Sequence, residues 1–129
     1  MPITVLLTND EEAVRISIRR LLDSDPEIRV VGEEASFQQA IQRAIELKPQ
    51  IVVMDLRMAV TSSVNPQEIK SQLNTLGSRL IAMSFWNDED AQALARSFGA
   101  VTLLDKLTLT TDLIPAIKAA SIKLRSANV

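Results

Sequence analysis

The sequence predicts a single α/β domain in which a parallel five-stranded sheet lies between two layers of helices. Short runs of Val, Ile and Leu alternate with amphipathic segments along the chain, and this alternation favours β-α units joined by crossovers. Two of the runs, residues 51–54 and 80–83, are apolar throughout, as expected for strands that helices cover on both faces. With 129 residues, 47% of them hydrophobic, the chain is large enough for one packed core.

Five apolar runs, rich in Val, Ile and Leu, are the predicted strands. They cover residues 4–7, 30–31, 51–54, 80–83 and 101–104. Because crossovers between parallel strands are right-handed, five consecutive β-α units favour the flavodoxin-like strand order 2-1-3-4-5. We expect the domain to span residues 1–125, with 126–129 as a tail or the start of a linker.

The first two predicted helices are bounded by proline and by a capping box. The first ends at Asp25, because a proline disfavours the helical conformation in the residue before it. Ser36 and Gln39 have the capping-box spacing that opens the second helix, and Pro49 follows its end. Their apolar faces consist of Val14, Ile18, Leu21 and Leu22 in the first helix and of Phe37, Ala40, Ile41, Ala44 and Ile45 in the second.

The other three predicted helices also carry start and stop signals. Asn65 is a cap with proline at the first helical position, and Gly77 closes that helix. Gly99 ends the next helix, and Pro115 is expected in the first turn of the last one, where its missing N–H is not needed. Their apolar faces consist of Ile69, Leu73 and Leu76, of Ala91, Leu94, Ala95 and Phe98, and of Leu113, Ile117 and Leu124.

The composition excludes several kinds of site. There is no cysteine and no histidine, which rules out disulfides, thiol nucleophiles, imidazole bases and metal sites built from Cys or His. A bound metal would be a hard cation with oxygen ligands, such as Mg²⁺. The net charge of −2 gives no reason to expect nucleic-acid binding. The N-terminus lacks a secretory signal pattern and no apolar run reaches membrane-spanning length, so we expect a cytoplasmic protein without membrane contact.

Polar residues follow four of the five predicted strands. In a sheet of this order, ligands bind beyond the carboxyl ends of the strands, at the switch point between strands 1 and 3. Asn9 and Asp10 follow the first strand and Asp55 follows the third, while Ser84 and Lys106 stand at the ends of the fourth and fifth. We therefore expect these side chains to meet at one edge of the sheet.

Asp55 is the most informative of these residues, because it follows four apolar residues where an unpaired charge is costly. One interpretation is a strand-end aspartate or a helix cap, although residues 56–64 show no amphipathic helix start. The other is a cation site, since Asp10 beside Asp55 would repel it unless a divalent cation lay between them. Two carboxylates, a backbone carbonyl and waters suit Mg²⁺. Glu11 and Glu12 are expected to complement the dipole of the first helix.

These groups indicate phosphoryl chemistry and disfavour an enzyme that acts on a separate small substrate. The chain has three glycines and neither a P-loop nor a dinucleotide-binding glycine motif. A carboxylate, Mg²⁺, a hydroxyl donor and a lysine are the parts needed to attack a phosphorus atom and to hold the resulting acyl phosphate.

Over nearly its whole length the chain resembles a CheY-like response-regulator receiver domain, nearest to the NarL/FixJ type. The similarity lies in VRISIRRLLDSDPEIRVVGEEAS, AIELKPQIVVMDLRM and SFGAVTLLDK. The resemblance implies that Asp55 accepts a phosphoryl group from a histidine kinase or a small phosphodonor. It implies further that Ser84 is the switch hydroxyl and that Lys106 pairs with a phosphoryl oxygen. Such a domain is a signalling module and not an enzyme, apart from self-catalysed phosphotransfer and dephosphorylation.

The resemblance also implies a Mg²⁺ site and an output face. The metal ligands would be Asp10, Asp55 and the backbone carbonyl of Arg57, with Asn9 as a further ligand, directly or through water. Phosphorylation would shift an equilibrium on the face made by helix 4, strand 5 and helix 5, and so change partner or homodimer contacts. By analogy, this face would control a transcription output domain that is absent from this chain.

Three of the residues that depart from the family pattern favour an alternative. Asn9 stands where a second aspartate is usual and should weaken Mg²⁺ binding. Phe85 follows Ser84 where a small residue is usual, and Leu103 replaces the usual switch aromatic. The alternative is a pseudo-receiver that serves as a phosphorylation-independent dimerisation or docking module. A flavin or small-ligand binder of the same fold is a third hypothesis, which the scarcity of glycines and aromatics near the strand ends disfavours.

Overall fold

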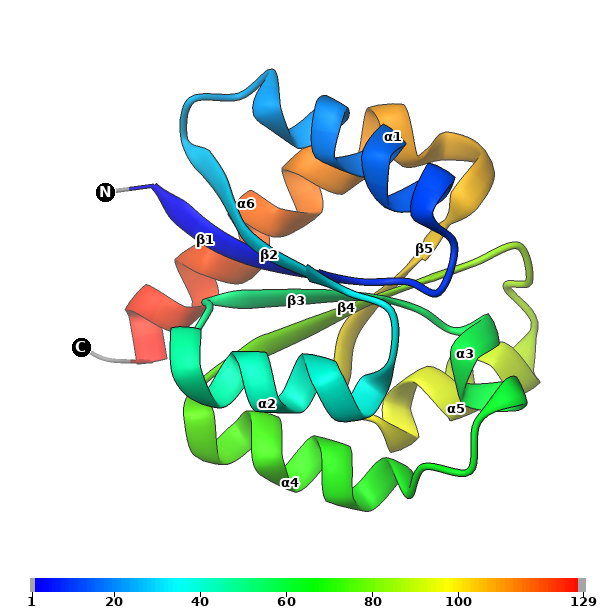
Figure 1. Ribbon diagram of the computed structural model, residues 1–129. Helices are drawn as coiled ribbons and strands as arrows, with labels where there is room; N and C mark the ends of the chain where they lie inside the picture. Colours follow the sequence, from blue (N-terminus) through cyan, green and yellow to red (C-terminus); the bar gives the residue numbers. More distant parts are fainter. Residues whose placement is uncertain (1, 128–129) are drawn as a thin grey trace.

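The computed structural model describes residues 2–127, with their side chains as far as Ile122. The strands are β1 (Ile3–Thr8), β2 (Ile28–Glu34), β3 (Ile51–Asp55), β4 (Arg79–Ser84) and β5 (Ala100–Asp105). They form one parallel sheet in the order β2-β1-β3-β4-β5, and helices cover both of its faces (Figure 1). The predicted fold class, the five strands and their order are therefore confirmed.

Helices cover the sheet from both sides. They are α1 (Glu12–Asp23), α2 (Phe37–Leu47), α3 (Arg57–Thr61), α4 (Pro66–Leu76), α5 (Glu89–Ser97) and α6 (Leu109–Ala127), with a 3-10 turn, η1, at Lys106–Thr108. Helices α1 and α6 lie on one face of the sheet, and α2, α4 and α5 lie on the other (Figure 1). The five helices expected from the sequence are α1, α2, α4, α5 and α6, so the predicted helix 4–strand 5–helix 5 face is the one made by α5, β5 and α6.

The core consists of two apolar layers, one on each face of the sheet. Successive residues of a strand point to opposite faces, so Val52 packs under α2 and α4 while Val53 packs under α1 and α6. In β3 every residue is buried, which explains why the run is apolar without alternation. None of the helices described is long and apolar enough to cross a membrane.

Local capping signals set the helix ends as predicted. The Ser36 hydroxyl accepts from the Gln39 N–H at 3.2 Å, and the Asn65 side chain accepts from the Gln67 N–H at 3.0 Å. Gly77 closes α4 in the left-handed region with φ of 74°, a conformation that glycine adopts without a steric penalty.

The edge strand β2 is longer than the predicted run 30–31, because its charged end has partners. Glu33 accepts from the Arg19 guanidinium at 2.6 Å, and Glu34 lies 3.2 Å from Arg43 Nε. A hydrophobic pattern alone does not detect such residues as part of a strand.

Two predictions about helices are wrong. Residues 56–64 contain α3, whose five residues are too few to show an amphipathic repeat; the buried Met58 holds it to the core. Pro115 lies inside α6 and not in its first turn, because the helix already begins at Leu109. The helix also continues past residue 125, the predicted end of the domain, and the division of the chain into domain and tail stays a prediction. Residues 128–129 and the side chain of Leu124 lie outside the described part.

Candidate functional site

The carboxyl ends of β1, β3, β4 and β5 form one edge of the sheet, which we call the carboxyl edge. Asn9 and Asp10 follow β1, Asp55 ends β3, Ser84 ends β4 and Lys106 follows β5. Asn9, Asp55 and Ser84 are buried, whereas the Asp10 side chain is 43% exposed. The predicted residues therefore combine a buried interior with an acidic rim that solvent ions can reach.

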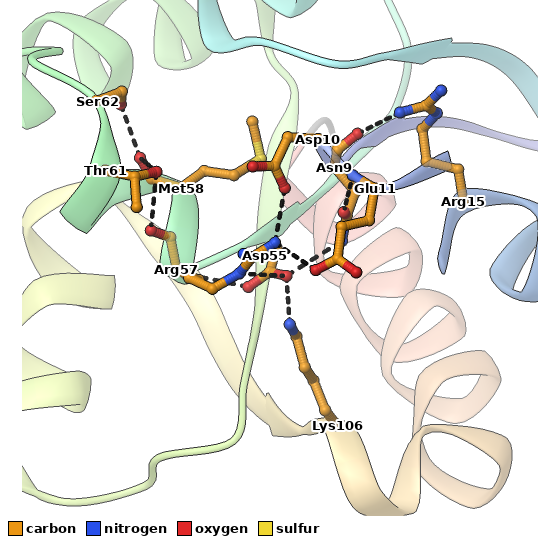
Figure 2. Close-up of polar contacts among 10 residues, drawn as sticks. All are labelled: Asn9, Asp10, Glu11, Arg15, Asp55, Arg57, Met58, Thr61, Ser62 and Lys106. Atoms are coloured by element: carbon orange, nitrogen blue, oxygen red, sulfur yellow. Dashed lines mark hydrogen bonds and ion pairs between the residues drawn. The ribbon is translucent and has the colours of Figure 1, made fainter. Parts of the chain in front are cut away.

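The Asp55 carboxylate has donors on both oxygens, as the close-up in Figure 2 shows. Its Oδ1 accepts from the backbone N–H of Arg57 at 3.0 Å, and its Oδ2 accepts from Asn9 Nδ2 at 3.2 Å. The Lys106 ammonium also donates to Oδ2. The contact with the Arg57 N–H agrees with the strand-end interpretation, whereas the cap position of α3 is Leu56. The ion pair with Lys106, which comes from another strand, goes beyond it.

The Asn9 side chain is oriented by the start of α1. Its Oδ1 accepts from the Glu11 N–H at 2.8 Å, so the amide nitrogen is the group that faces Asp55. The Arg15 guanidinium donates to the Asn9 backbone carbonyl at 2.6 Å and holds the loop from the other side. As a metal ligand, directly or through water, Asn9 would use the second lone pair of this oxygen.

The Arg57 side chain lies among three carboxylates, whereas only its backbone carbonyl was expected at the site. Its Nη2 lies 2.7 Å from Asp10 Oδ1 and 2.5 Å from Glu11 Oε1, and its Nε lies 3.9 Å from Asp55 Oδ2. Figure 2 shows the guanidinium between these acids. The signal that could have found it is a basic residue two positions after the buried aspartate, but its partners come from a loop 46 residues earlier in the chain.

The end of the neighbouring strand β4 places the Ser84 hydroxyl and the Phe85 ring near the ion pair. Ser84 Oγ accepts from the Trp86 N–H at 2.8 Å, and the structure contains no hydrogen bond between Ser84 and Asp55 among the described residues. Lys106 Nζ lies 4.8 Å from the centre of the Phe85 ring, a cation–π distance. Phe85 and Trp86 are 63% and 53% exposed, so both rings are open to partners at this edge.

The oxygen atoms of the site fit a hard cation. Carboxylates of Asp10 and Asp55 converge on one positively charged group, the Arg57 guanidinium, and carboxylate oxygens are the ligands that Mg²⁺ prefers. In the described part of the chain, no three acidic side chains meet in a metal-binding arrangement. A Mg²⁺ site here would therefore use two carboxylates, the Arg57 carbonyl and water, with the guanidinium moved away.

The comparison with protein families decides the class of domain. The family model described as "Response regulator receiver domain" matches residues 5–118. The chain belongs to the response regulator receiver family. This receiver domain has the five-stranded order and the acidic carboxyl edge described above, and the resemblance found in the sequence is confirmed.

Relatives of this receiver domain are regulators that are longer than this chain. It is 34% identical over 119 residues to the response regulator protein VraR of Staphylococcus saprophyticus, which covers 92% of this chain and 56% of the relative. It is 30% identical to the transcriptional regulatory protein LiaR of Bacillus subtilis, and the match again covers 92% of this chain and 56% of the relative. The chain thus spans little more than half the length of the curated relatives it matches.

Solved structures show the same fold. The signal receiver domain of the response regulator NarL from Mycobacterium tuberculosis superposes with a TM-score of 0.81 over 93% of this chain and 96% of that one. The identity is 21%, so this likeness concerns the fold alone.

Proposed function

We propose that this receiver domain accepts a phosphoryl group on Asp55 from a histidine kinase, in a Mg²⁺-dependent reaction. The observation that carries the proposal is the position of Asp55. It is a buried carboxylate at the switch point, bonded to Lys106 from another strand and flanked by the exposed acid Asp10. Receiver domains are signalling domains, and the family membership supports this role over that of a metabolic enzyme.

The chemistry follows from the groups at the carboxyl edge. An oxygen of Asp55 attacks phosphorus and forms an O–P bond, while the P–N bond to the donor histidine breaks and the imidazole regains its proton from solvent. Lys106 Nζ then pairs with a phosphoryl oxygen, and the Ser84 O–H can donate a hydrogen bond to another. Mg²⁺, when bound by Asp10, Asp55 and the Arg57 carbonyl, would supply positive charge opposite the phosphoryl oxygens.

The proposed function includes an output face that responds to phosphorylation. Phosphorylation shifts contacts on the face made by α5, β5 and α6, which takes part in a homodimer or docks an output domain. LiaR is a transcriptional regulatory protein by name, and the relatives extend beyond the matched region. We therefore propose a transcription output domain outside this chain, a cytoplasmic location, and no direct nucleic-acid contact by the receiver itself.

Acetyl phosphate and Mg²⁺ provide the test, with intact-protein mass spectrometry as the readout. We expect one phosphoryl group on the wild-type domain and none on Asp55→Asn. Asp105→Asn is the matched control, because it removes a carboxylate at a neighbouring strand end and keeps a side-chain acceptor for the Leu107 N–H. Absence of labelling in the wild type, or labelling that persists in Asp55→Asn, would rule out the proposal.

A second function, the pseudo-receiver, is favoured by one observation. Both Asp55 oxygens are satisfied by donors of the protein itself, so the site is stable without phosphoryl group or metal. In that case the fold would serve as a constitutive dimerisation or docking module. Concentration-dependent dimerisation that is the same before and after acetyl phosphate treatment would favour this second function.

A further inference from the structure

Arg57 is the single cationic side chain that the described residues place against Asp10 and Glu11. Its Nη2 is within 2.7 Å of both, and its Nε faces Asp55 at 3.9 Å. In the described part of the chain, neither Asp10 nor Glu11 has another ion-pair partner. Without the guanidinium, the ion pair between Lys106 and Asp55 would be the one left to these three carboxylates among the described residues.

The Arg57 side chain can leave this position at little cost. It is 37% exposed, and its two close partners are 43% and 53% exposed, so water can solvate all three groups when they separate. Ion pairs of this kind are weak and are screened by salt. Arg57 is therefore positioned to alternate between the acids and solvent.

We propose that Arg57 is an internal counter-cation that competes with Mg²⁺ for Asp10 and Asp55. This inference deepens the proposed function and rests on its metal site. In the metal-free domain the guanidinium neutralises the acids, and binding of the divalent cation requires it to move away from Asp10. The same residue thus has two opposite effects, because its backbone carbonyl belongs to the ligand set and its side chain opposes metal binding.

The competition explains how this carboxyl edge is stable without a metal. Asn9 supplies a neutral amide donor to Asp55 and Lys106 supplies one positive charge, so the two carboxylates need only one more positive group between them. Arg57 supplies that charge from within the chain. The affinity for Mg²⁺ is then set by the guanidinium as well as by the missing aspartate at position 9.

Titration with Mg²⁺ alone, followed by calorimetry and by Trp86 fluorescence, tests the proposal on the whole chain. We expect Arg57→Met to bind Mg²⁺ about threefold to tenfold more tightly than the wild type, the range that the loss of one or two exposed ion pairs gives. Lys118→Met is the matched control. Lys118 is 38% exposed and pairs with two carboxylates, Asp25 and Glu27, which precede β2 at the opposite edge of the sheet. Equal or weaker binding in Arg57→Met than in the control would overturn the proposal.

A second measurement needs no variant. In the wild-type domain, the NMR signal of the Arg57 Nε–H group should shift with added Mg²⁺ along the same saturation curve as the Trp86 signal. An Arg57 signal that stays constant while Mg²⁺ binds would also overturn the proposal.

The result of the Mg²⁺ titration can be distinguished from that of the phosphorylation test. Labelling of Asp55 by acetyl phosphate together with equal Mg²⁺ affinities would refute the competition and leave the proposed function intact. Tighter Mg²⁺ binding in Arg57→Met with no labelling of either protein would support the competition and refute phosphoryl transfer.

Discussion

Lys106 Nζ donates to Asp55 Oδ2 and joins the end of β5 to the end of β3, although the two residues are 51 positions apart in the chain. The Lys106 side chain is 9% exposed and that of Asp55 is fully buried. A buried charge that loses its partner is strongly destabilising, whereas a pair removed as a whole is much less so. This ion pair therefore belongs to the stability of the fold as well as to the site.

The first prediction concerns that pair. Lys106→Met should lower the free energy of unfolding by about 2 to 3 kcal/mol, less than for a fully isolated buried charge, because Asn9 and the Arg57 N–H still donate to Asp55. Adding Asp55→Asn should recover part of the loss, since no uncompensated carboxylate remains. Urea unfolding of the wild type, both single variants and the double variant measures this coupling. A double variant that is less stable than Lys106→Met would contradict it.

The second prediction concerns Asn9. Asn9→Asp keeps an oxygen for the Glu11 N–H but places a carboxylate where an amide donates to Asp55. We expect the metal-free variant to melt at a lower temperature than the wild type and Mg²⁺ to raise its melting temperature more. A ligand at a concentration 100 times its dissociation constant adds about 2.7 kcal/mol to the free energy of unfolding.

Asn65→Asp is the control for this change. It converts an amide to an acid at the cap of α4, where the side chain accepts from the Gln67 N–H, and should leave the Mg²⁺ response unchanged. The prediction is wrong if Mg²⁺ stabilises Asn9→Asp no more than the wild type.

The third prediction concerns Phe85, whose ring covers the ammonium of Lys106. Phe85→Ala should change the free energy of unfolding by less than about 0.5 kcal/mol, because the ring is largely exposed. It should speed labelling of Asp55 by acetyl phosphate, since the approach to the carboxyl edge becomes wider. Leu107→Ala is the control, because Leu107 is 77% exposed and lies in the turn after Lys106. Equal labelling rates in the two variants would show that Phe85 does not restrict access.

The fourth prediction concerns pH and the pair Asp25–Lys118 at the other edge of the sheet. The hydrogen bond from Lys118 lowers the pKa of Asp25 below its ordinary value of 3.8, and the hydrogen bond to Asp25 raises the pKa of Lys118 above 10.5. A carboxyl group with a lowered pKa stabilises the folded state at pH values above its ordinary pKa. That contribution to stability is lost as the pH falls through the lowered pKa. The contribution of Lys118 to stability is present below its ordinary pKa and is lost as the pH rises through the raised pKa.

Thermal unfolding of the wild type and of Lys118→Met, measured as a function of pH, tests this dependence of stability on pH. The wild type should be the more stable of the two near neutral pH, and the difference should shrink below pH 3.8. NMR titration should show the Asp25 pKa returning toward its ordinary value in Lys118→Met. Asp25→Asn should weaken the acid dependence of the difference, since Glu27 remains as a partner of Lys118. A difference that persists unchanged in acid would refute the role of this pair.

Much of the fold could be predicted because its signals are local. Asn65, Pro66 and Gly77 set the two ends of α4 through bonds within a few residues, and a run such as 51–54 identifies a strand buried on both faces. The helix α3 and the position of Pro115 were missed, because five residues show no period and the start of α6 depends on how η1 leaves the sheet.

The sequence by itself determined the order of the sheet and the types of residue at its carboxyl edge, since parallel strands place their ends together whatever the side chains do there. Only the tertiary structure decided how those side chains pair. The Asn9 amide turns its nitrogen to Asp55 because the Glu11 N–H takes its oxygen, and the Arg57 guanidinium reaches Asp10 and Glu11 across 47 and 46 residues of chain. Which charges pair depends on the distance between them in the folded structure, and their separation along the chain does not reveal that distance.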